Sequence, residues 1–340
     1  MEYSVVQESE IRRRLTIVAF VSAMLVVLCH LDDFAHDASS LLSYMGSTFS
    51  DSNTANFFLL SGYFLARHFG SENWYRKAIE KRCRSLLAPY IVWNFLIFVL
   101  IACGSFVKFA LGQGDLGTVK ILYADDFGLT RILGLGVTLP PYDFPLWYIK
   151  SLFLFVLVSP VIFKILSQSR FQTAILICIS LILNYCVWAF SLPQVKFFSL
   201  CFPLQGFIFF MIGASIAIRK WPQLVVPSRM LTLISVALWI VTSWIAMLLP
   251  RTLQLALRPC YIVFAMFAIH VIAATVRINL PMWVSSSVFI LYAAHFPLLQ
   301  YSSFLGPWMS LGFTVVICIL MSVVVHRYFS RFVWLLTGGR

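Results

Sequence analysis

The chain has 340 residues, of which 61% are apolar and only 11% are charged. Soluble domains carry about 25% charged residues, so this composition excludes a water-soluble globular protein and indicates a polytopic membrane protein. The net charge of +12 does not indicate nucleic-acid binding, because the basic residues flank apolar stretches, as anionic lipid headgroups favour. We therefore expect residues 1–340 to form one integral-membrane domain without a separate soluble part.

Apolar stretches of spanning length recur along the whole chain. They predict ten transmembrane helices at about 15–34, 54–69, 88–111, 146–166, 171–190, 199–218, 230–249, 259–276, 283–304 and 309–333. Of the 25 lysines and arginines, 18 fall in the tails and connections of one side and 6 in those of the other. The positive-inside rule then places both termini in the cytoplasm. We predict an all-α, multi-pass protein of the cell (inner or plasma) membrane.

Two connections stand out. The connection 67–87 is a strongly basic loop between two apolar spans, with Arg67, Arg76, Lys77, Lys81, Arg82 and Arg84. The connection 112–145 is long and apolar but broken by glycine and proline. Irregular backbone at membrane depth must line protein or water, so this segment predicts a re-entrant or surface-lying stretch beside a cavity.

Five pieces of the sequence, in order, resemble the acyltransferase-3 family of integral-membrane acyltransferases. They are His30 in VVLCH, FFLLSGYFLAR at 57–67, KRCRSLLAPYIVW at 81–93, PLWYIKSLFLFVLVSPVI at 145–162 and SVFILYAAHFPLL at 287–299. The chain departs from the family at Ala19, where an arginine is usual. Whether Arg14, which lies nearer the N-terminus, replaces that arginine is left open by the sequence.

The resemblance implies O-acyl transfer, commonly of acetyl from acetyl-CoA, to a hydroxyl of a cell-envelope sugar or a small molecule. Acyl-CoA would then be a co-substrate, and no cofactor would be bound permanently. Neither acyl length, acceptor nor oligomeric state can be read from the sequence. The eight cysteines form no CxxC pair, so no metal site is expected.

O-acyl transfer requires a base for the hydroxyl proton, and His30 is the leading candidate. Imidazole titrates near neutral pH, and an ionisable group on a membrane span indicates function. Asp33 lies three residues later, on the same face if the helix continues, and could orient the ring. The alternative is that His30 only ends the first span among the outer headgroups.

Other candidates follow from the resemblance or from charge. Lys81, Arg82 and Arg84 suit the phosphates of coenzyme A, although lipid phosphate would satisfy the same loop. His295 has a substrate-binding or structural role near the site, or is an ordinary buried histidine. Four further residues are placed near the site, with helix packing or an interfacial aromatic belt as their alternative roles: Ser61, Tyr63, Trp147 and Tyr148. Lys150 is a minor candidate.

A transporter or flippase for a small molecule or a lipid-linked sugar is the main alternative, because ten spans and broken helices suit either function. Transporters often contain paired, interrupted spans in two repeats, and no convincing repeat is visible. A receptor or scaffold has little support, because the larger connections lack the character of binding modules. The expected partners are membrane lipids, acyl-CoA and a glycan or small-molecule acceptor.

Overall fold

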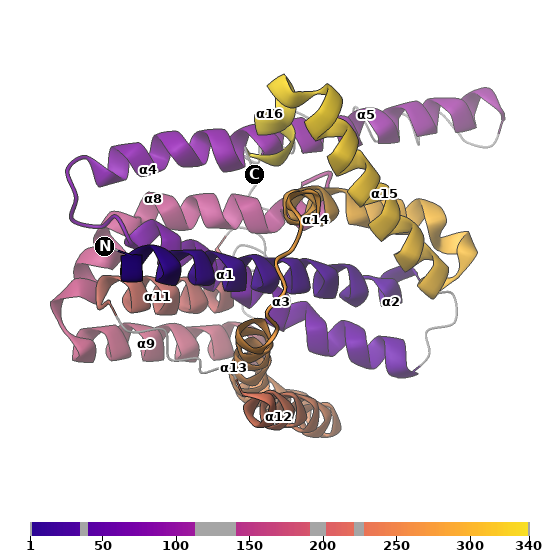
Figure 1. Cartoon of the computed structure of the whole chain (residues 1–340). Helices are drawn as coiled ribbons and strands as arrows, with labels where there is room; N and C mark the ends of the chain where they lie inside the picture. Colours follow the sequence, from indigo (N-terminus) through magenta and orange to yellow (C-terminus); the bar gives the residue numbers. More distant parts are fainter. Residues whose placement is uncertain (1, 35–39, 113–140, 191–201, 221–227, 339–340) are drawn as a thin grey trace.

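The computed structural model describes residues 2–34, 40–112, 141–190, 202–220 and 228–338, and every regular element within them is a helix (Figure 1). The longer helices are α1 (Glu2–Cys29), α3 (Ser40–Ala66), α5 (Ala88–Ala110), α8 (Trp147–Gln168), α9 (Arg170–Ala189), α11 (Leu204–Ile218), α12 (Arg229–Leu248), α13 (Arg251–Thr275), α14 (Met282–Ser302) and α15 (Pro307–Tyr328). The short ones are α2 (Leu31–Phe34), α4 (Trp74–Arg82), η1 (Cys83–Leu87), η2 (Phe144–Leu146), η3 (Ser303–Leu305), η4 (Ser330–Phe332) and α16 (Val333–Thr337). The predicted all-α class is confirmed.

The chain is a polytopic membrane protein. Within the described residues, seven helical segments are long and apolar enough to cross a bilayer, and α11 is apolar but has only 15 residues. Large apolar side chains face outward on several of these segments, for example Phe106, Ile182 and Leu233, as contact with lipid requires. The number of ten spans and the cytoplasmic position of both termini stay predictions. The expected re-entrant segment lies largely at 113–140, outside the described residues.

The helices form a bundle whose two ends differ. In Figure 1, α1, α3, α8, α9 and α11 lie side by side along one direction, whereas α12 and α13 are viewed nearly end-on beside them. The beginnings of α1 and α4 and the end of α3 lie together at the left of this view. We call this the basic end. The opposite end holds the end of α1 and the start of α3.

The closest packing in the bundle joins α3 to α11. A Cβ atom added at Gly62 would lie 2.0 Å from the carbonyl oxygen of Phe210, and one added at Gly213 would lie 2.0 Å from that of Leu59. The two backbones therefore touch at two glycines, one on each helix, as small residues allow in membrane helices. The packing alternative for the Ser61–Gly62 pair is thus borne out for Gly62.

The prediction of a basic loop over 67–87 is wrong from Trp74 onward. This part forms α4 and η1, and the helix continues into α5. No glycine or proline lies between Trp74 and Ala88, so nothing in that stretch ends the helix. Pro89 has no N–H to bond to the preceding turn. The π-helical turn η1 lies directly before α5, and such a turn accommodates the missing bond.

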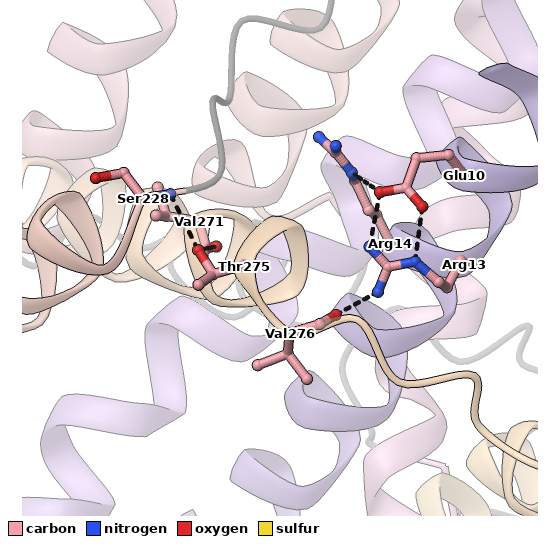
Figure 2. Close-up of polar contacts among 7 residues, drawn as sticks. All are labelled: Glu10, Arg13, Arg14, Ser228, Val271, Thr275 and Val276. Carbon is pink, nitrogen blue, oxygen red and sulfur yellow. Dashed lines mark hydrogen bonds and ion pairs between the residues drawn. The ribbon is translucent and has the colours of Figure 1, made fainter.

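In its N-terminal half, α1 is fastened to the end of α13 (Figure 2). Glu10 accepts hydrogen bonds from Arg13, at 2.8 and 2.7 Å, and from Arg14, at 2.7 Å. Arg13 also donates to the carbonyl of Val276, which follows the last turn of α13. The hydrogen bonds from Arg13 lower the pKa of Glu10 to about 2, and the carboxylate raises the pKa of Arg13. A cation at the carboxyl end of α13 also complements its dipole.

The start of α12 is joined to the end of α13 at the same place. The backbone N–H of Ser228 donates to the Thr275 hydroxyl at 3.2 Å, and that hydroxyl donates to the Val271 carbonyl at 2.8 Å (Figure 2). Two helix ends and the N-terminal helix therefore meet in one polar cluster, which holds the N-terminal half of α1 in position.

Candidate active site

His30 and Asp33 lie together at the end of α1 that is opposite the basic end. His30 follows the last residue of α1 and is held by its N–H, which donates to the Val27 carbonyl at 3.2 Å. Its Nδ1 atom is 2.6 Å from Oδ2 of Asp33. A carboxylate only accepts hydrogen bonds, so Nδ1 carries the proton and Nε2 keeps the lone pair that a base needs. The predicted contact is present, and its catalytic role stays a prediction.

A second histidine lies beside the first, with its ring tilted to it. The ring of His295, on α14, has its centroid 5.3 Å from that of His30, and the side chain is fully buried. Its Nδ1 lies 2.8 Å from the Tyr292 carbonyl and 3.0 Å from the Leu291 carbonyl. Nδ1 must therefore donate, and the neutral ring then presents Nε2 as an acceptor. The structure thus brings the two predicted histidines together.

His30 lines a cavity of about 300 Å³, which we call the outer cavity. Its polar and aromatic wall is made by side chains from α3, α8, α9, α11 and α13: Thr54, Trp147, Asn184, Trp188, Gln205 and Arg258. Phe58 and Pro145 complete the wall toward the middle of the bundle. A base beside a small cavity with polar side chains on its wall can act on a hydroxyl compound held there.

A larger cavity of about 860 Å³ opens at the basic end, and we call it the inner cavity. Five basic side chains line it: Arg12, His68, Lys77, Lys81 and Arg82. Toward the middle of the bundle the wall becomes apolar and aromatic, with Phe57, Tyr148 and Phe289. A ligand with anionic groups at one end and an uncharged arm at the other matches this gradient.

The two cavities adjoin at Tyr292, which lines both of them. Its hydroxyl donates a hydrogen bond to the Pro145 carbonyl. The rings of Tyr148 and Phe57 lie 5.8 and 6.2 Å from the Tyr292 ring, and both face the inner cavity. These three rings form a wall, which we call the aromatic septum.

The Pro145 carbonyl is positioned by the residues before α8. The Asp143 N–H donates to Oδ1 of Asn94, at 3.1 Å, and Asn94 itself donates to the Tyr90 carbonyl, at 3.0 Å. This fastens the segment to α5, two residues ahead of Pro145. The Asp143 carboxyl is buried, which raises its pKa well above the usual value and favours the neutral acid.

The remaining predicted residues divide between cavity walls and other positions. Ser61 lines the inner cavity, with its hydroxyl 3.2 Å from that of Tyr148. Trp147 and Tyr148 are neighbours but face different cavities. The structure brings neither Arg84, Tyr63 nor Lys150 to either cavity. Tyr63 instead lies beneath the Arg67 guanidinium, 5.9 Å away.

The structure also shows cavity residues that the sequence had not assigned to the site. Arg12 and Ala19 line the inner cavity from one face of α1, together with Leu15 and Thr16 between them. Residues three or four positions apart lie on the same face of a helix, so the sequence alone could have indicated this face of α1. Arg14 is bonded to Glu10 instead and does not line the cavity, so Arg12 is the arginine that shares a face with Ala19. Tyr292 lies in the stretch 287–299 that resembles the family, although no role for it followed, and Arg258 carried no comparable signal.

Within the described part of the chain, no three His, Cys, Asp or Glu side chains are grouped so that they could hold a metal ion. A profile of the acyltransferase-3 family, described as an acyltransferase domain, matches residues 15–327. No curated protein and no solved structure gives a significant match.

Proposed function

The chain belongs to the acyltransferase-3 family and is a membrane acyltransferase, and we propose that it moves an acyl group, acetyl in the simplest case, from acyl-CoA to a hydroxyl. The donor would bind from the cytoplasm in the inner cavity. The acceptor, a cell-envelope sugar or a similar compound, would bind in the outer cavity. The protein would act in the cell (inner or plasma) membrane.

The observation that carries this proposal is the pairing of two unlike cavities across one side chain. The inner cavity is basic at its mouth, and the outer cavity contains the His30–Asp33 pair, while Tyr292 lines both. Transfer between a charged donor and a hydroxyl acceptor needs these two environments close together. It also needs a wall that keeps water from the thioester.

The donor end of the proposal depends on Arg12, Lys77, Lys81 and Arg82. Guanidinium and ammonium groups bind phosphate oxygens by charge-assisted hydrogen bonds. The phosphates of coenzyme A would lie among these four side chains, with the uncharged pantetheine arm directed along the apolar wall toward Tyr148 and Tyr292. The thioester would then reach the aromatic septum.

The chemical step uses His30 as the general base. Nε2 takes the proton of the acceptor hydroxyl while the hydroxyl oxygen bonds to the thioester carbonyl carbon. The carbon–sulfur bond then breaks, and the thiolate takes the proton back from the imidazolium, which leaves an ester and free coenzyme A. Asp33 holds the Nδ1 proton and stabilises the imidazolium, as their 2.6 Å separation allows.

A transporter or flippase would also use cavities at opposite ends of a bundle, but it would not cleave the donor. The test is release of free thiol from acetyl-CoA by the purified chain in proteoliposomes with an envelope-glycan extract as acceptor. We expect His30→Ala to lower this release by about 10²-fold or more, the usual contribution of a general base. His326→Ala serves as the control, because His326 on α15 lines neither cavity.

Full turnover of His30→Ala would refute His30 as the base. Wild-type protein that moves a labelled glycan across the membrane, without any thiol release, would instead support the transporter.

A further inference from the structure

Several polar side chains line the outer cavity, more than the transfer chemistry alone requires. Two indole rings, Trp147 and Trp188, and two amides, Asn184 and Gln205, line it. Flat aromatic faces offer sugars an apolar surface, and amides give and accept hydrogen bonds with hydroxyl groups. The volume of about 300 Å³ is at the lower limit for small-molecule sites, so the cavity suits a single sugar unit.

The same wall carries a fixed positive charge. Among the described lining residues, Arg258 is the side chain that is charged at every physiological pH, and no aspartate or glutamate lines the cavity with it. Its guanidinium carbon lies over the Trp188 ring, 5.7 Å from the ring centroid. A cation–π contact of this kind holds the guanidinium plane against the indole ring.

We propose that the acceptor is an anionic sugar, with a carboxylate or a phosphate bound by Arg258 and a hydroxyl directed to His30. This inference rests on the proposed function, because it treats the outer cavity as the acceptor site. A planar guanidinium binds a carboxylate or phosphate through two parallel hydrogen bonds. Arg258 on α13 and His30 after α1 then hold two different groups of one ligand.

The experiment measures binding without any acyl donor. Purified chain in uncharged detergent is titrated with glucuronic acid, glucose 1-phosphate and glucose, and the shift of the thermal unfolding midpoint gives each dissociation constant. We expect at least one of the two anionic sugars to bind about tenfold or more tightly than glucose, the worth of a charge-assisted hydrogen-bond pair. Equal binding of all three sugars overturns the proposal.

Three variants test the role of Arg258. Arg258→Gln should remove the preference for the anionic sugar. Arg258→Lys keeps the charge but not the planar guanidinium with its paired donors, so it should retain part of the preference. Lys108→Gln is the matched control, because Lys108 is an exposed cation in the last turn of α5 that lines neither cavity. A preference that survives in Arg258→Gln contradicts the proposal.

A lipid phosphate is the other anion within reach of a membrane protein. The titration is therefore repeated in nanodiscs of phosphatidylcholine with and without phosphatidylglycerol. If phosphatidylglycerol abolishes the binding of the anionic sugar, Arg258 binds a lipid headgroup and the proposal is wrong. The binding titration contains no acyl-CoA, so its result does not depend on acyl transfer. If the separate thiol-release assay shows no release, the proposed function is refuted and the binding result stands. If all three sugars bind equally while acyl transfer is normal, only the inference of an anionic acceptor is refuted.

Discussion

Arg82 and Arg84 are two residues apart but occupy different surroundings. Arg82 lines the inner cavity, whereas Arg84 is exposed on η1 and does not. Arg82→Glu should therefore raise the KM for acetyl-CoA by about tenfold, the worth of a lost charge-assisted bond, and leave the KM for the acceptor unchanged. Arg84→Glu is the matched control and should change neither constant. Steady-state kinetics of thiol release measures both, and equal effects of the two variants would contradict phosphate binding in the inner cavity.

The hydroxyl of Tyr292 holds the aromatic septum through its bond to Pro145. Tyr292→Phe keeps the ring but loses that bond, so we expect the acceptor-independent hydrolysis of acetyl-CoA to rise several-fold relative to transfer. Tyr75→Phe is the control, because Tyr75 also donates to a backbone carbonyl, that of Leu157 at 3.0 Å, but lines neither cavity. The ratio of hydrolysed to transferred acyl groups is the readout. An unchanged ratio in Tyr292→Phe would show that the septum does not exclude water.

Single side chains differ in how far the sequence predicts them. The contact of His30 with Asp33 follows from their spacing of three residues on a helical path. The contact of His30 with His295 joins segments 265 residues apart, and no local pattern predicts it. Likewise, every cation of a basic connection satisfies the positive-inside rule, so the sequence could not separate Arg82, on the cavity wall, from Arg84.

Among the helices, the contact of α3 with α11 sets how closely the bundle packs around both cavities. Gly62→Ala places a Cβ atom against the Phe210 carbonyl, and the resulting overpacking should lower the free energy of unfolding by about 1–3 kcal/mol. Gly104→Ala in α5 is the control, since a Cβ there meets nothing within 4 Å. It should raise helix stability by up to about 1 kcal/mol. Thermal unfolding in detergent would show shifts of opposite sign, and shifts of the same sign would contradict the close approach.

Helix existence was predicted well, and helix boundaries less so. Apolar length identified the segments that became α5, α8, α9, α12, α13, α14 and α15. At 67–87 the density of basic residues led to the prediction of a loop. That prediction is wrong for Trp74–Arg82, because no residue there breaks a helix. The span predicted at 259–276 begins earlier, because α13 starts at Arg251 and continues through Pro259. Membrane helices tolerate proline when neighbouring groups satisfy the freed carbonyl.

The whole molecule places unlike chemistry at its two ends. The inner cavity carries basic side chains at the basic end, and the His30–Asp33 pair lies beyond Tyr292 toward the opposite end. Composition alone predicted a multi-pass membrane protein, and charge distribution predicted which end is basic. The cavities themselves arise where α1, α3, α8 and α14 meet, which only the folded chain shows.

Supplying the donor to one side at a time tests the central claim most directly. Proteoliposomes are sorted by orientation with an affinity tag at the C-terminus, acceptor is placed on both sides, and acetyl-CoA is added to one side only. We predict thiol release only when acetyl-CoA is on the side of the basic end, and its loss in His30→Ala. Equal release with acetyl-CoA on the opposite side would contradict the account.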